Sequence, residues 1–213
     1  MFCHCGGVHE RLVDLPVPTG TRQQLDFLLT AHRLTSVTRV NRLLDDSRGE
    51  TSAEHSWHLA VAALVLAPQV APDVDLARVL AMVLLHDLVE VDAGDVPIYD
   101  EDARQAVLAA EQAAAVRLFG LLPDGESDAL LRLWREAEAV ETDDARFAKA
   151  LDRLQPLLLH WAGNGRAWAE RGITVEQERR IMAVIGQYWP PLAPIAATLI
   201  DDAHARGMLG SEA

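Results

Sequence analysis

The sequence predicts an all-α fold, a single helical domain of about eight helices. Apolar residues make up 50% of the 213 residues, which allows a sizeable core and excludes a disordered chain. Aromatic residues are only 5% of the chain, so Leu, Ala and Val must supply most of the packing. Leu and Ala favour helices, and no alternation of apolar and polar residues persists long enough to predict a strand.

Residues 1–20 are expected to form an irregular lead-in, because they contain Gly and end in Pro-Val-Pro-Thr-Gly. The helical domain is expected to cover residues 21–207. Its first helix starts near Thr21 and carries four leucines on or near one face: Leu25, Leu28, Leu29 and Leu34.

Residues 43–52 are polar and contain Gly, so they predict a loop. Ser52 is expected to cap a second helix, whose apolar residues and Trp57 indicate that it is largely buried. A third helix over residues 75–91 is apolar on nearly every side, as is typical of a helix at the centre of a bundle. Gly94 ends it.

The second half of the chain continues this pattern of helices closed by Gly. One helix ends at Gly120, the next starts at Ser127 or Asp128, and Thr142 caps another. The first three of these helices are expected over residues 101–120, from residue 127 or 128 onward, and over 143–163. The two last helices are expected over residues 175–188 and 191–206.

The formal net charge is −13 and the isoelectric point is about 4.9. Nucleic acid polymers are excluded as partners, because their binding depends on Lys and Arg that neutralise phosphates. A small anionic substrate is compatible with this charge, since a divalent metal or a few cations can reverse the potential inside one pocket.

Cysteine usage and hydropathy predict a cytoplasmic protein that contacts no membrane. Cys3 and Cys5 flank His4 without the spacing of a zinc knuckle, and they allow no disulfide framework in the rest of the chain. The sequence has no apolar run of about 18 residues and no signal peptide.

The most informative residues are His86 and Asp87, inside the apolar segment 75–91. An ionised Asp among apolar residues costs several kcal/mol unless it is paired, and a cation is an effective partner. Glu90 lies one turn later, and Asp95 follows Gly94. The alternative is a buried His–Asp hydrogen bond with Glu90 and Asp95 in solvent.

Two further segments carry ionisable groups among apolar residues. His55 and His58 are three residues apart on the second helix, and imidazole is a common metal ligand. We interpret His58 as a core residue. Asp152 lies between Leu151 and Leu154, and the alternative for it is an ion pair with Lys149, the only lysine of the chain, or with Arg153.

These residues occur in the strings AEHSWHLA, LLHDLVEVDAGD and FAKALDRLQP. Their order, His, then His-Asp, then Asp, resembles the HD-domain superfamily of metal-dependent phosphohydrolases. The strings look like the branch that contains the 5′-deoxynucleotidases, and the resemblance covers roughly residues 25–165. It implies an HD-domain helical bundle.

The resemblance also implies a site. One divalent transition metal, Mn, Co, Fe or Zn, would be bound by four ligands: His55, His86, Asp87 and Asp152. Glu90 matches an acid near the attacking water, and Asp95 one that contacts the sugar hydroxyl or the water network. Arg42, or else Arg39, would hold the phosphate. The nucleotidases carry a Trp beside this Arg, whereas here the neighbours are Val40, Asn41 and Leu43.

The expected activity is hydrolysis of a small phosphomonoester, such as a (deoxy)nucleoside 5′-monophosphate. One alternative is a two-metal phosphodiesterase or oxygenase, for which His58 and His160 are the obvious extra ligands. Another is a non-catalytic domain that binds a metal or ligand. The last helices could bury a homodimer interface or close the core with three apolar residues: Trp189, Leu192 and Leu199.

Overall fold

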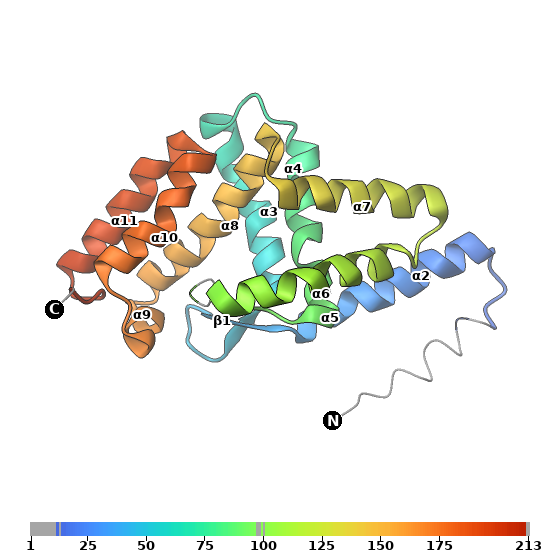
Figure 1. Ribbon diagram of the computed structural model, residues 1–213, viewed down its shortest axis with the longest axis horizontal. Coiled ribbons are helices and arrows are strands. Elements are labelled where there is room, and N and C mark those ends of the chain that lie inside the picture. The colour runs from blue at the N-terminus through green and yellow to red at the C-terminus, as the bar shows by residue number, and fades with distance from the viewer. Residues whose placement is uncertain (1–11, 13, 97–98, 100, 212–213) are drawn as a thin grey trace.

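The computed structural model describes residues 12, 14–96, 99 and 101–211, so Cys3, Cys5 and most of the predicted lead-in lie outside the described residues. The fold is mostly helical, which confirms the predicted class (Figure 1). Eight helices of ten or more residues lie in the described part: α2 Thr19–His32, α3 Ser52–Val70, α4 Leu76–Leu85, α6 Glu101–Phe119, α7 Asp124–Ala139, α8 Asp143–Ala162, α10 Val175–Tyr188 and α11 Ala193–Ala205. Shorter helical segments connect them: η1 Arg33–Ser36, η2 His86–Val89, α5 Glu90–Ala93, α9 Arg166–Arg171 and η3 Pro190–Leu192.

Helix α8 lies at the centre of the molecule and contacts α3, α4, α7, α10 and α11 (Figure 1). It begins where predicted, because the Thr142 hydroxyl accepts a hydrogen bond from the Ala145 amide, and it ends at Gly163. Its buried side chains join one large core with those of α3, α4, α10 and α11. A smaller core forms between α2, α6, α7 and η2.

The two last helices close the large core. Leu192 is fully buried, and Trp189 Nε1 donates a hydrogen bond to the Val70 carbonyl over 2.9 Å. Of the two predicted roles for these apolar residues, the structure therefore supports core closure. The expectation that the helix with Trp57 is largely buried is wrong in part, because Trp57 is 64% exposed and Leu64 and Val65 are also exposed.

The structure corrects the predicted loop over residues 43–52. Strands β1 Thr38–Arg42 and β2 Gly49–Thr51 form an antiparallel hairpin. Strands of five and three residues are too short for alternation to reveal them. Gly49 is required at the pairing, because a Cβ there would lie 2.7 Å from Thr38 Cγ2 and 2.8 Å from the Arg39 carbonyl oxygen. The hairpin places Thr51, rather than the predicted Ser52, as the cap of α3.

The predicted helix over residues 75–91 is interrupted. Helix α4 ends at Leu85, the chain tightens into the 3₁₀ segment η2, and α5 follows until Gly94, whose φ is 79°. The tighter segment begins at His86, the first residue of the motif that the sequence singled out. Such 3₁₀ stretches within helical runs are often found at functional positions.

Two smaller expectations are also wrong. In α2 the buried residues are Phe27 and Thr30, while Leu28 and Leu29 are exposed. Helix α7 begins at Asp124, directly after Pro123, and not at Ser127 or Asp128. No helix among the described residues is both long and apolar enough to cross a membrane.

A buried carboxyl on α10 gives a stability prediction. Glu178 is 0% exposed and accepts a hydrogen bond from the Tyr99 hydroxyl over 2.9 Å. Burial raises its pKa from 4.5 to about 7. The folded state binds this proton more tightly than the unfolded state does. The free energy of unfolding therefore falls as the pH rises from the unfolded-state pKa to the folded-state pKa, by about 3 kcal/mol at most.

Replacing Glu178 with Gln keeps an acceptor for Tyr99 and removes the titration. We expect the variant to gain stability relative to the wild type as the pH rises from 5 to 8, measured by urea denaturation at each pH. A difference in stability that does not change with pH would contradict the assigned titration.

Candidate metal centre and cleft

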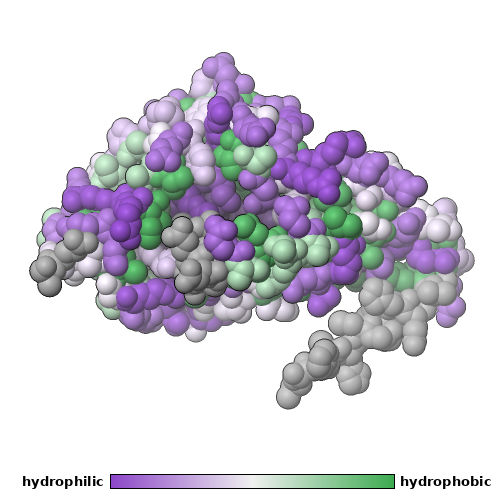
Figure 2. Space-filling view, viewed as in Figure 1, coloured by the Kyte–Doolittle hydropathy of each residue, from purple (hydrophilic) through white to green (hydrophobic). Residues whose placement is uncertain are grey.

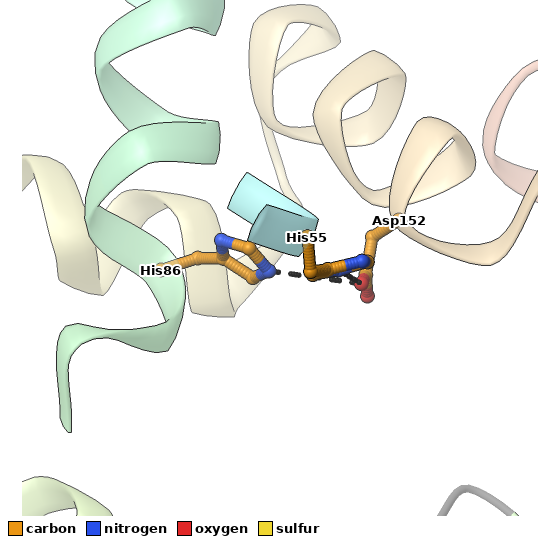
Figure 3. A group of neighbouring side chains, drawn as sticks. All are labelled: His55, His86 and Asp152. Carbon is orange, nitrogen blue, oxygen red and sulfur yellow. Dashed lines mark hydrogen bonds and ion pairs between the residues drawn. The ribbon is translucent and has the colours of Figure 1, made fainter. Parts of the chain in front are cut away.

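Three of the four predicted metal ligands meet at one point from three different elements. His55 lies in the first turn of α3, His86 begins η2, and Asp152 lies in the middle of α8 (Figure 3). Their candidate ligand atoms all lie within 4.8 Å of one another. Asp152 Oδ1 is 3.1 Å from His55 Nε2 and 3.6 Å from His86 Nε2.

Asp87, the fourth predicted ligand, borders the same point. Its Oδ1 is 3.0 Å from His86 Nε2, and its Oδ2 is 3.9 Å from His55 Nε2. The same Oδ2 accepts a hydrogen bond from Arg39 Nη1 over 2.9 Å. The structure thus brings all four residues together, although they are separated by up to 97 positions in the chain.

The donor set fits a divalent metal. His86 Nδ1 lies 3.0 Å from the Val83 carbonyl oxygen, to which it can only donate, so a neutral His86 has its lone pair on Nε2. This Nε2 is buried and has no hydrogen-bond partner among the described residues, although it faces the two carboxylates. Two imidazoles with two carboxylates form a mixed N/O set suited to Mn²⁺, Fe²⁺, Co²⁺ or Zn²⁺.

The pKa values indicate an excess of negative charge. Burial opposes a charge on His86, but Asp87 and Asp152 outweigh burial and raise its pKa to about 10. Burial and then the charge of Asp87 raise the pKa of Glu90 to about 9. In both cases the cluster gains positive charge by binding a proton, which is the electrostatic condition that also favours a cation.

The predicted catalytic acids line the same cluster. Glu90 accepts a hydrogen bond from the Ser52 hydroxyl over 2.5 Å, and Arg39 Nη1 lies 3.7 Å from Glu90 Oε1 and 3.2 Å from Asp95 Oδ1. Burial raises the pKa of Asp95 as well. Ser52, predicted as a helix cap, therefore holds Glu90 instead.

Of the two predicted phosphate-binding arginines, only Arg39 reaches the cluster. Its side chain is 13% exposed, and Asp87, Asp95 and Glu90 outweigh burial to keep it charged, with a raised pKa. Arg42, which the sequence favoured, instead contacts Asp46 within the turn of the hairpin. The hairpin directs the two side chains to different places, since Arg39 lines the cleft of the cluster and Arg42 lines a separate pocket together with Asp46.

The cluster lies in a cleft with about 1080 Å³ of empty space, part of it open to solvent. Figure 2 shows a hydrophilic hollow near the middle of one face of the molecule. Lys149 and Arg153 line the cleft, and both contact Asp152 Oδ2, at 3.4 and 3.7 Å. With Arg39 they place three cations around the site of a protein with net charge −13.

The two histidines considered as extra ligands have other partners. His58 Nδ1 lies 3.1 Å from Gln155 Nε2. His160 Nε2 lies 2.9 Å from Asn41 Oδ1, and burial lowers the pKa of His160 to about 4. Within the part of the chain that the structure describes, the metal-type group contains neither of them.

Comparisons with known proteins agree with this geometry. The profile of a family described as "HD domain" matches residues 31–188. A 5′-deoxynucleotidase HDDC2 from Bos taurus is 29% identical over 140 residues, which is 65% of this chain and 67% of the relative. The human protein of the same name is 28% identical over the same length.

One solved structure is similar over most of the chain. The crystal structure of a predicted metal-dependent phosphohydrolase from Magnetospirillum magnetotacticum MS-1 has 40% sequence identity and a TM-score of 0.83. The match covers 91% of this chain and 100% of that protein. A conserved hypothetical protein from Pyrococcus furiosus shares the fold, with a TM-score of 0.58 at 18% identity.

Proposed function

We propose that this chain, which belongs to the HD-domain family of metal-dependent phosphohydrolases, releases phosphate from a small phosphomonoester, a (deoxy)nucleoside 5′-monophosphate. The observation that carries the proposal is the buried convergence of His55, His86 and Asp152 beside a cleft lined by cations. The similarity to 5′-deoxynucleotidases supports the nucleotide as the substrate class.

A bound divalent transition metal would polarise a phosphoryl oxygen and acidify a water molecule at this site. The side chains around it divide the remaining work. Glu90 is within the cluster but is not one of the four proposed ligands. The positive charge of a bound metal would lower its raised pKa, and the ionised Glu90 would then orient the attacking water and accept its proton. Ser52 fixes one oxygen of Glu90 and leaves the other near Arg39.

The cations of the cleft suit a phosphate dianion. Lys149 and Arg153 approach Asp152 from the side of the open cleft, and Arg39 approaches Asp87 from β1. Groups of this kind stabilise the charge that develops on a transferring phosphoryl group, and they do so most strongly where water is excluded. Asp95 contacts Arg39 and would hold the sugar hydroxyl or the water network.

The test is phosphate release by metal-stripped protein that has been reloaded separately with Mn²⁺, Co²⁺, Zn²⁺ or Mg²⁺. The substrates are a panel of ribo- and deoxynucleoside 5′-monophosphates, simple sugar phosphates and one phosphodiester. Metal-dependent release from nucleoside monophosphates is the expected result. If the protein binds a metal stoichiometrically yet releases phosphate from no monoester, the proposal is refuted. If it hydrolyses the diester alone, the chain is a phosphodiesterase instead.

The two arginines give a matched pair of variants. Replacing Arg39 with Ala is expected to lower kcat/KM by about 10²-fold. Replacing Arg42 with Ala, which removes a partly exposed ion pair with Asp46, is expected to leave kcat/KM within about twofold. Steady-state kinetics with each variant at its optimal metal concentration test this difference, and a larger effect of Arg42 would reverse the assignment.

Arg39→Ala also removes a buried cation from four carboxylates, which can cost about 3–5 kcal/mol of stability. The kinetics are therefore measured at a temperature where thermal denaturation shows both variants to be folded.

A further inference from the structure

A buried chain of hydrogen bonds lies directly behind His55, on the side away from the cleft residues. Gln155 is one turn after Asp152 on α8 and is 3% exposed. Its Oε1 lies 3.0 Å from His55 Nδ1. Its Nε2 lies 2.8 Å from Glu50 Oε1 and 3.1 Å from His58 Nδ1.

Glu50 fixes which way the Gln155 amide points. A carboxylate oxygen accepts hydrogen bonds and cannot donate them, so the atom 2.8 Å from Glu50 Oε1 must be the amide nitrogen. A flipped amide would place two acceptors against each other in a site where Glu50 is 2% exposed, and burial makes such a contact costly. His58 Nδ1 takes the second amide hydrogen.

The orientation of the amide in turn fixes the tautomer of His55. Because the Gln155 carbonyl oxygen can only accept, His55 Nδ1 must carry the hydrogen. In a neutral ring, Nε2 is then the atom with the lone pair, and it is Nε2 that faces Asp152 Oδ1 at 3.1 Å. Two acceptors this close are stabilised by a shared cation.

We propose that Gln155 is a positioning residue that holds His55 in the Nδ1–H tautomer, with Nε2 ready to bind the metal, and that Glu50 and His58 orient its amide. The inference deepens the proposed function, since the metal concerned is the one on which that reaction depends. Partners of this kind fix the ring and increase the basicity of a ligating histidine, and their loss typically costs 10–100-fold in metal affinity.

The Glu50 carboxylate is placed to orient the Gln155 amide. Among the described residues its Oε2 has no hydrogen bond, and the nearest basic atoms are His55 Nδ1 at 3.8 Å and Arg39 Nε at 3.9 Å. Its described hydrogen bond is the one from Gln155. A buried carboxylate whose hydrogen bond within the described part of the chain comes from the amide is well suited to set the direction of that amide.

The first test is the ring-nitrogen spectrum of His55 in wild-type protein loaded with diamagnetic Zn²⁺, recorded by long-range ¹H–¹⁵N NMR and assigned with His55→Gln. We expect Nδ1 to be protonated and Nε2 unprotonated. The second test is metal affinity measured by competition with a chelator, using Co²⁺ and Zn²⁺. Gln155→Leu should lower affinity by about 10–100-fold and lose the single tautomer, whereas Gln24→Leu, which alters a surface contact with Glu126, should change neither.

A charge-conserving exchange separates positioning from packing. The double variant Glu50→Gln with Gln155→Glu keeps an acceptor against His55 Nδ1 and a donor between residues 50 and 155. His58 Nδ1 loses the amide hydrogen that it accepts in the wild type, and it can instead donate to the new carboxylate in its other tautomer. We expect it to recover the Nδ1–H tautomer and most of the metal affinity that Gln155→Leu loses.

An Nε2–H tautomer in the wild type would overturn the inference without any variant, as would wild-type metal affinity in Gln155→Leu. If Gln155→Leu fails to fold, the wild-type spectrum and the exchange variant still test whether Gln155 fixes the tautomer of His55. Neither measurement depends on turnover. A protein with the expected spectrum and affinities that releases no phosphate would refute the proposed function and leave this inference standing.

Discussion

Replacing Asp87 with Ala is expected to remove both the bound metal and all measurable phosphate release. Asp87 faces His86 Nε2 at 3.0 Å and His55 Nε2 at 3.9 Å, so its carboxylate borders both proposed nitrogen ligands. Burial alone would raise its pKa, but His86 and Arg39 hold the pKa well below its usual range. Asp87 is therefore ionised at neutral pH and ready to bind a cation. Losing such a ligand should cost at least as much as losing an outer partner, about 10–100-fold in metal affinity.

Thermal denaturation with and without metal tests the loss of metal binding in Asp87→Ala separately from catalysis. A ligand that binds only the folded state adds about 2.7 kcal/mol at 100 times its Kd. The wild type should therefore melt at a higher temperature when metal is added, and Asp87→Ala should show no such change. Asp201→Ala, which removes an exposed carboxylate paired with Arg179, is the control and should behave as the wild type. Full activity of Asp87→Ala would contradict the proposed metal centre.

The convergence of the site was predictable because buried ionisable groups are expensive. His55, His86 and Asp152 each stand in a segment rich in apolar residues, and the cost of burying ionisable groups there favours a common partner. Their meeting point follows from the packing of α3, α4 and α8, the helices that the same apolar residues hold together. The sequence thus contained both the groups and the reason for them to meet.

The choice between Arg39 and Arg42 was not predictable in the same way. It depends on how the hairpin directs the two side chains, and β1 was not recognised as a strand because only five residues form it. With residues 43–52 treated as a loop, the two arginines appear equivalent. The hairpin separates them, since Arg39 enters the cluster and Arg42 remains with Asp46.

Gln155, Lys149 and Arg153 were missed for a different reason. Polar residues on an amphipathic helix normally face solvent, so nothing in the pattern of α8 distinguishes a residue that lines a cleft. Lys149 and Arg153 were recognised only as alternative ion-pair partners of Asp152, and they lie 3.4 and 3.7 Å from its Oδ2. The cleft beside that ion pair is lined by residues of β1, η2, α6 and α8, so its presence depends on how distant parts of the chain come together.

Replacing Glu90 with Gln is expected to leave metal binding intact and to lower kcat by about 10²–10⁴-fold, the usual contribution of a general acid or base. The amide has the size of the carboxyl and can still accept the Ser52 hydrogen bond, so the fold and the four proposed ligands are undisturbed. It cannot accept a proton from water. Because kcat should fall with little change in KM, the variant separates a catalytic acid or base from a group that holds substrate.

The control for Glu90→Gln is Asp92→Asn, two residues further along α5, where the carboxylate contacts Arg117 outside the cluster. Metal content by elemental analysis, chelator competition and steady-state kinetics are compared for the two variants. A Glu90→Gln protein with wild-type kcat would exclude Glu90 as the base. If Glu90→Gln instead loses its metal as Asp87→Ala does, Glu90 is a ligand and a different group must activate the water. The candidate for that role is Asp95, which after Asp87 is the carboxylate that lies closest to Arg39 in the cluster.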